Sequence, residues 1–131
     1  MEINLSIGSS YISEKIVNYE DTAAHYGSGL VEVFATPAMI ALMENAAMHA
    51  ALKDLPEGFN TVGTAVSIVH SKATPKGMKV SAKATLTKID RKRLVFDVIA
   101  NDEQGEIGRG THERYIIDTA KFMQKLTASK N

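Results

Sequence analysis

Residues 37–53 constrain the fold of this chain most strongly, because they form a helical stretch that is apolar on nearly every side. Three polar residues interrupt its middle: Glu44, Asn45 and His49. Thr36 and Pro37 mark its start, since a threonine hydroxyl can cap the first turn and proline suits the first helical position. A helix that is apolar nearly all round is expected to be buried, so the sequence predicts one long central helix.

After Gly58 the apolar residues recur every second position, which is typical of β-strands. Four extended segments follow: residues 61–70, 79–87, 94–100 and 106–117. Shorter extended pieces are predicted at residues 15–19 and 30–34. Asp118 is expected to cap a final helix at residues 119–127.

This order predicts an α+β chain of the hotdog type, in which one long buried helix is wrapped by a curved antiparallel β-sheet of about five strands. The four later strands are expected to form a meander. The 131 residues suit one domain spanning residues 1–131. A lone sheet protects one side of the helix, so a second copy is expected to cover the rest, as a homodimer or a dimer of dimers.

Composition excludes several classes of function. Fifteen basic and fifteen acidic residues cancel, so there is no basic field for nucleic acid or an anionic membrane. The absence of cysteine excludes thiol catalysis and cysteine metal sites. Residues 1–10 lack a signal-peptide pattern and no apolar run is long enough for a membrane span, so a cytoplasmic protein is expected. We also expect no metal site, because the histidines are not spaced with carboxylates as ligands.

Glu44 is the first candidate for chemistry, because a carboxylate in an apolar helix is costly unless it is paired or reactive. The alternative is an exposed helix position, since glutamate is rarely buried. His70 shares a strand face with Val62, Val66 and Ile68, which predicts that it points toward the core. There it is either a hydrogen-bonded structural residue or an acid–base partner for a carboxylate.

Three further residues each allow two interpretations. Thr36 is either a plain cap or part of a helix start whose free N–H groups stabilise a carbonyl oxygen. Gly63 either lets a ligand approach the strand backbone or marks a bulge. Arg114 is either a ligand-binding residue or a surface residue paired, for example, with Glu113.

Five motifs together resemble one family. They are Ala35-Thr36-Pro37, Glu44 eight residues after Thr36, the strand at 61–70, Ala73-Thr74-Pro75 with Gly77, and Gly110-Thr111-His112-Glu113-Arg114. Over roughly residues 13–123 the chain resembles the fluoroacetyl-CoA thioesterase-like family of hotdog acyl-CoA thioesterases. It departs from the fluoroacetyl-specific members at Asn45, where a bulky aromatic is expected, and in the loop at 26–30, which lacks a phenylalanine.

The resemblance implies a thioester hydrolase that converts a short-chain acyl-CoA to free acid and coenzyme A. It implies that Thr36, Glu44 and His70 are catalytic and that Arg114 contacts the coenzyme A part of the substrate. Gly63 is the second candidate for substrate binding, because an acyl chain or pantetheine could pass close to its backbone. No cofactor is implied. The alternative is a non-catalytic hotdog protein that binds an acyl-CoA or another small ligand; a hydratase would need an Asp/His pair near the helix start, which we do not find.

Helix geometry adds one expectation about assembly. Eight helical residues from Thr36 to Glu44 span about 12 Å, too far for both to reach one small acyl group. If both act on one carbonyl, the sequence predicts composite sites in a dimer, each combining the helix start of one chain with Glu44 of the other.

Overall fold

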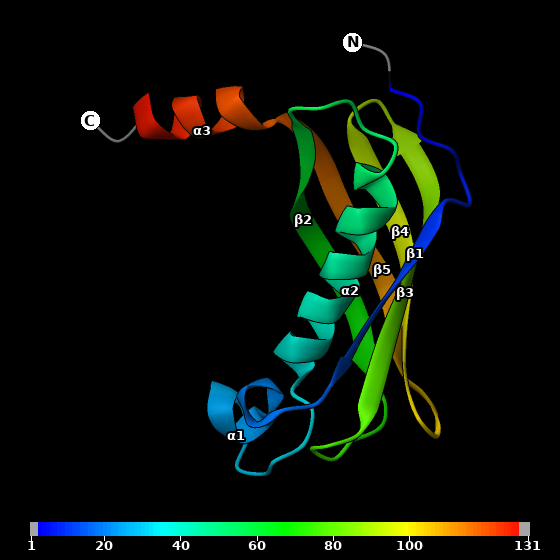
Figure 1. Cartoon of the computed structure of the whole chain (residues 1–131), viewed down its shortest axis with the longest axis vertical. Helices are drawn as coiled ribbons and strands as arrows, with labels where there is room; N and C mark the ends of the chain where they lie inside the picture. The colour runs from blue at the N-terminus through cyan, green and yellow to red at the C-terminus, as the bar shows by residue number, and fades with distance from the viewer. Residues whose placement is uncertain (1–2, 129–131) are drawn as a thin grey trace.

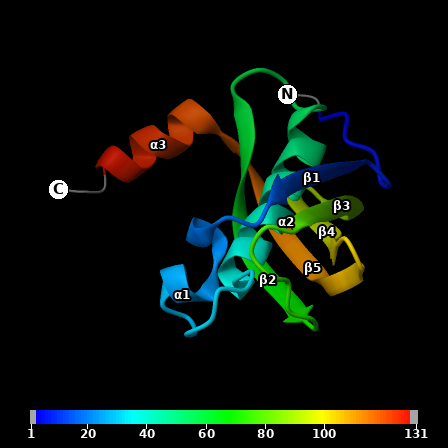
Figure 2. The same cartoon turned by 60° about the horizontal axis from the view of Figure 1, so that its bottom comes forward.

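The computed structural model describes residues 3–128. The strands are β1 (Ser10–Ile16), β2 (Phe59–His70), β3 (Lys79–Asp90), β4 (Arg93–Asp102) and β5 (Gly105–Asp118). The helices are α1 (Ala23–Tyr26), α2 (Thr36–Leu52) and α3 (Thr119–Ala128), with a 3₁₀ turn at Tyr19–Asp21. The sheet curves around α2, which crosses its concave face (Figures 1 and 2). One long helix on a curved antiparallel sheet is the α+β arrangement that the sequence predicts.

The strand order is β1-β3-β4-β5-β2, with antiparallel pairing throughout. β3, β4 and β5 form a meander, but β2 pairs with β5, so the predicted four-strand meander is wrong. The connection at residues 71–78 carries the chain across the sheet from β2 to β3. The first strand lies at 10–16 rather than 15–19, and residues 30–34 form only isolated bridges. β1 and β2 are therefore the two edges of the sheet.

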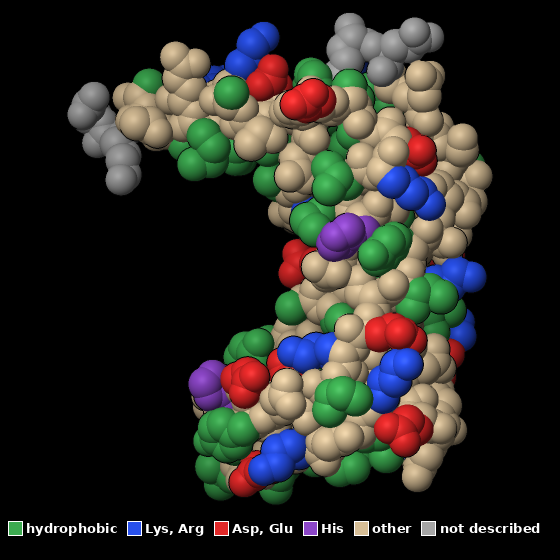
Figure 3. Space-filling model, viewed as in Figure 1, with side chains coloured by type: hydrophobic (Ala, Val, Ile, Leu, Met, Phe, Trp, Pro, Cys, Tyr) green, Lys and Arg blue, Asp and Glu red, His purple; other side chains and the backbone are tan. Residues whose placement is uncertain are grey.

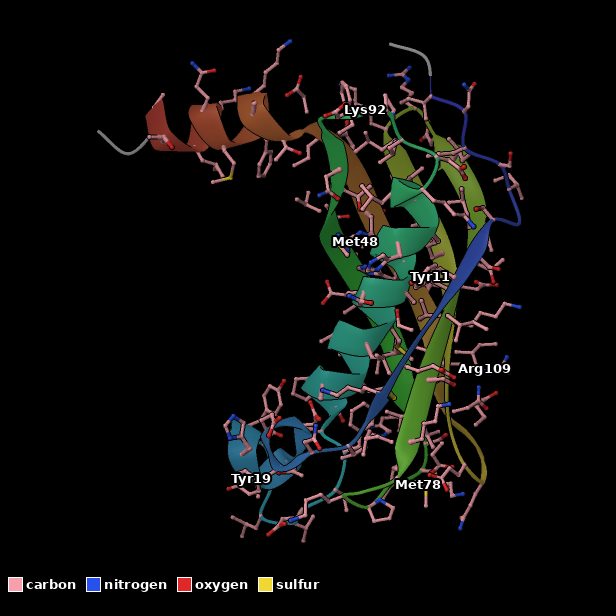
Figure 4. All side chains as sticks on the ribbon, viewed as in Figure 1. Tyr11, Tyr19, Met48, Met78, Lys92 and Arg109 are labelled. Carbon is pink, nitrogen blue, oxygen red and sulfur yellow. The ribbon has the colours of Figure 1, made fainter. Side chains whose placement is uncertain are left out.

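α2 buries only the side that faces the sheet. Its buried residues are mostly small or flexible: Ala38, Met39, Leu42, Met43, Ala46, Ala47, Ala50 and Ala51. Thr36 is exposed, and Ile40, Glu44 and Met48 follow it at four-residue spacing as a partly exposed row; Figure 4 labels Met48. The prediction of a helix buried on all sides is therefore wrong for the single chain, because one sheet covers one side.

A β-bulge interrupts β2, where the register against β5 shifts between Gly63 and Ala65. Before the bulge Val62 pairs with Tyr115 on the outer face, and after it Val66 pairs with His112 on the face toward α2. The expected two-residue pattern therefore breaks, and Val62 does not share a face with His70. Bulges re-aim side chains and are common beside functional sites.

Two segments, α3 and the stretch around α1, project to the same side of the sheet. α3 extends from the end of β5, and the segment around α1 extends from the opposite end, so the outline between them is hollowed (Figures 1 and 3). The expected cap of α3 is confirmed, because Oδ1 of Asp118 accepts from the Lys121 N–H at 3.2 Å. None of the helices within residues 3–128 is both long and apolar enough to cross a membrane.

Candidate active site

Thr36 and His70 meet where α2 begins and β2 ends. Oγ1 of Thr36 lies 2.8 Å from Nδ1 of His70, within hydrogen-bonding distance. Ala35 is the N-cap of α2 and no side chain caps the helix, with Pro37 in the first turn. The predicted capping role of Thr36 is therefore wrong, because its hydroxyl bonds to the histidine instead.

The second ring nitrogen of His70, Nε2, is buried and is hydrogen-bonded to no other side chain within residues 3–128, while the ring packs edge-on against Phe34. Burial lowers the pKa of His70 below its ordinary value of 6.5, so the ring is neutral at pH 7. A cavity of about 490 Å³ adjoins it, lined by residues that include Thr36, His70 and Lys72. A molecule in this cavity meets an imidazole that can exchange a proton and the unpaired N–H groups of the first helical turn.

Glu44 lies further along α2 and belongs to a second cluster. Its side chain is 43% exposed, so the expected burial of this carboxylate is wrong in the single chain. Its Oε2 lies 4.0 Å from Nε2 of His112 and 3.9 Å from Nη1 of Arg114. Within residues 3–128 it makes no hydrogen bond or ion pair with His70, since a long stretch of helix separates it from Thr36. The imidazole beside Glu44 is therefore that of His112.

Arg114 is a buried residue held by three hydrogen bonds. Its Nε donates to Oγ1 of Thr61 at 2.7 Å, its Nη2 donates to the Thr61 carbonyl at 2.9 Å, and its Nη1 lies 3.1 Å from Nε2 of His112. The alternative of a surface ion pair with Glu113 is wrong, because Glu113 pairs with Arg93. The guanidinium therefore faces the Glu44 carboxylate in a fixed orientation.

His112 is a site residue that the interpretation of the sequence missed. Its side chain is 2% exposed, and Nδ1 lies 2.8 Å from the carbonyl oxygen of Ala65. Strand alternation could have identified it, because residues two apart in a strand share a face and His112 precedes Arg114 by two. The missing information was that Glu44 lies on the same face.

Gly63 provides the space in which Glu44 sits. A Cβ added at this position would lie 2.7 Å from Oε2 of Glu44 and 3.2 Å from Cε1 of His112. The bulge interpretation of this glycine is confirmed, because it borders the register shift in β2. The group that approaches its backbone in the structure is the Glu44 side chain, and the approach of a ligand stays a prediction. A smaller cavity of about 240 Å³ opens here, lined by residues that include Glu44, Gly63 and His112.

The two clusters together contain the groups that acyl transfer needs. A carboxylate can act as base or nucleophile, a neutral imidazole can shuttle a proton, and helix N–H groups can stabilise an oxyanion. Thr36 is hydrogen-bonded to His70, and Glu44 lies against Gly63 and Arg114. Within one chain the Thr36 cluster and the Glu44 cluster lie at different positions along α2.

Comparisons with known proteins agree with this chemistry. Residues 17–120 match the family model described as fluoroacetyl-CoA-specific thioesterase. The fluoroacetyl-CoA thioesterase of Streptantibioticus cattleyicolor is 35% identical over 132 aligned residues, covering 96% of this chain and 95% of that protein.

Solved structures also include members of the same thioesterase family. A mutant of the fluoroacetyl-CoA-specific thioesterase in complex with fluoroacetate and CoA is 35% identical, covers 90% of this chain and 99% of its own, and superposes with a TM-score of 0.84. A hot-dog-like protein from Thermanaerovibrio acidaminovorans shares the fold, with 24% identity, a TM-score of 0.87, and coverage of 97% of this chain and 94% of its own. The hotdog fold and the predicted resemblance are confirmed, and the chain belongs to the family of fluoroacetyl-CoA-specific thioesterases.

Proposed function

We propose that this thioesterase hydrolyses a short-chain acyl-CoA to the free acid and coenzyme A, using composite sites at the interface of a homodimer. The relative solved with fluoroacetate and CoA supports a substrate made of a small acyl group and coenzyme A. Coenzyme A enters only as part of the substrate, and the proposed reaction uses no metal or cofactor. We place the reaction in the cytoplasm, as the sequence predicts.

The observation that carries the dimer proposal is the separation of the two clusters. Thr36 and Glu44 lie on the same partly exposed row of α2, beside the edge strand β2. Thr36 contacts His70 of β2, and Glu44 faces Arg114 of β5. An unpaired strand edge favours pairing with another copy of the same edge. Two copies related by a two-fold axis would set their α2 helices antiparallel, which brings the start of one helix toward Glu44 of the other.

In this arrangement each group has one task. The first-turn N–H groups at Thr36 stabilise the negative charge on the thioester oxygen. In one route Glu44 of the second chain removes a proton from water, the resulting hydroxide attacks the carbonyl carbon, and Nε2 of His70 passes the proton on to the departing thiolate. In the other route Glu44 attacks the carbonyl carbon and expels the thiolate; water then hydrolyses the acyl-glutamyl anhydride, and His70 passes the proton of that water to the thiolate. This arrangement places Arg114 and Gly63 at the acyl end of the substrate, because both border Glu44, and not at the coenzyme A part that the resemblance implies for Arg114.

The test is release of free thiol from acetyl-, propionyl-, butyryl- and fluoroacetyl-CoA, followed with a thiol reagent. Wild-type protein is expected to hydrolyse at least one of these thioesters. Glu44→Gln removes the base while keeping the shape, so turnover should fall by about a thousand-fold or more with CoA binding retained. Tight binding without hydrolysis across the panel would instead support a binding protein, and near-normal turnover of Glu44→Gln would reject the role of Glu44.

A further inference from the structure

The two imidazoles of the site differ in what their nitrogens can still do. One nitrogen of His70, Nε2, is hydrogen-bonded to no other side chain within residues 3–128. His112 has neither nitrogen free: Nδ1 faces the Ala65 carbonyl at 2.8 Å and Nε2 faces Nη1 of Arg114 at 3.1 Å. An imidazole with both nitrogens bound cannot take a proton from water, although it lies beside Glu44.

These contacts determine the tautomer of His112. A carbonyl oxygen only accepts, so Nδ1 must carry the hydrogen and donate to Ala65. Nε2 of the neutral ring is then an acceptor, which matches the guanidinium that donates to it. Burial lowers the pKa of His112 and the Arg114 charge lowers it further, so the neutral form is maintained at pH 7.

The acceptor nitrogen of His112 supplies the third hydrogen bond that fixes the Arg114 guanidinium. Thr61 binds Nε and Nη2, which leaves Nη1 as the group that points at Oε2 of Glu44 from 3.9 Å. Without His112, Nη1 would lose its hydrogen-bond partner in a buried site, and the guanidinium could tilt away from the carboxylate. A shift of about 1 Å at such a position is enough to impair catalysis strongly.

We propose that His112 is a positioning residue for thioester hydrolysis: as a neutral hydrogen-bond acceptor it keeps Nη1 of Arg114 directed at Glu44. The inference rests on the proposed function of Glu44. It assigns no proton transfer to His112, which leaves His70 as the imidazole that exchanges protons.

Two substitutions at this position separate the two ring nitrogens. His112→Gln places an acceptor near the position of Nε2 and so retains the contact with Arg114. His112→Asn keeps a donor near Nδ1 for Ala65 and lacks that acceptor. We expect kcat/KM of His112→Gln to stay within about five-fold of wild type and that of His112→Asn to fall by about a hundred-fold. His49→Gln, a histidine of α2 outside the site, is the matched control and should keep wild-type kcat.

The pH profile of kcat distinguishes a positioning role for His112 from a role in proton transfer. The acidic limb of kcat against pH should persist in His112→Gln, because His112 does not titrate during turnover. Loss of that limb, equal losses in both variants, or wild-type activity in both would overturn the inference. If neither variant folds, Thr61→Val decides: it removes the acceptor for Nε, so an about ten-fold loss of kcat/KM supports the fixed guanidinium and no loss overturns it. A fully active Glu44→Gln would instead refute the proposed function itself.

Discussion

At the scale of single residues, the site depends on side chains whose partners are fixed by burial. His70 and His112 are both kept neutral, because burial lowers the pKa of each below the ordinary value of 6.5. In the unfolded chain the pKa of each histidine returns to its ordinary value of 6.5. Between the lowered pKa values and 6.5, the unfolded state therefore binds more protons than the folded state.

This difference predicts how stability depends on pH. The free energy of unfolding should be greatest above pH 6.5 and should fall as the pH drops below it, since acid stabilises the unfolded chain. Urea denaturation of wild type at pH about 7.5 and about 5.5 measures the loss, and His70→Gln should lose less than wild type. An equal loss in the two proteins would show that His70 does not contribute to this dependence.

At the scale of elements, the bulge in β2 determines where Glu44 can sit. Thr64 stabilises this bulge, because its Oγ1 donates to Oε2 of Glu113 at 2.6 Å. Gly63, next to it, has no side chain, so the carboxylate of α2 fits against the strand backbone. The strand therefore carries both the irregularity and the small residue that the site needs.

Two glycine substitutions test whether Gly63 makes room for Glu44, one at that glycine and one at a glycine packed against backbone. Gly63→Ala should displace Glu44, whose flexible end would lie 2.7 Å from the new Cβ, so kcat should fall by about a hundred-fold with a stability loss of about 1 kcal/mol. Gly110→Ala puts its Cβ 2.0 Å from the Ser67 carbonyl oxygen, which is backbone, so that variant should fail to fold. Circular dichroism and thiol release measure both effects. A Gly63→Ala enzyme with wild-type kcat would contradict the close approach of Glu44.

Elements with a strong local pattern could be predicted from the sequence, and their partners could not. The periodicity of residues 37–53 and of the later strands is local, so α2 and β3 to β5 lie close to their predicted positions. The pairing of β2 with β5 and the bulge at Gly63 depend on contacts between distant segments. For the same reason the sequence indicated Glu44 and Arg114 individually, but not that Thr61 and His112 would hold Arg114 facing Glu44.

At the scale of the whole molecule, one chain exposes surface that a second copy would cover. Val66 and Val69 of the edge strand β2 are 43% and 66% exposed. The hollow between α3 and the segment around α1 lies on the same side as the open face of α2 (Figure 3). Sedimentation should therefore give the mass of a dimer or a dimer of dimers, and Val66→Lys at the β2 edge should weaken association and activity together. A fully active monomer would contradict the composite site.

The most direct test of the composite site mixes two inactive proteins, Thr36→Ala and Glu44→Gln. If each site uses Thr36 of one chain and Glu44 of the other, every mixed dimer contains one intact site and one doubly altered site. Equal amounts that exchange freely should then recover about a quarter of wild-type kcat, with mass spectrometry confirming that mixed dimers form. Mixed dimers no more active than the two parent variants would contradict the account, because they would place Thr36 and Glu44 of the same chain in one site.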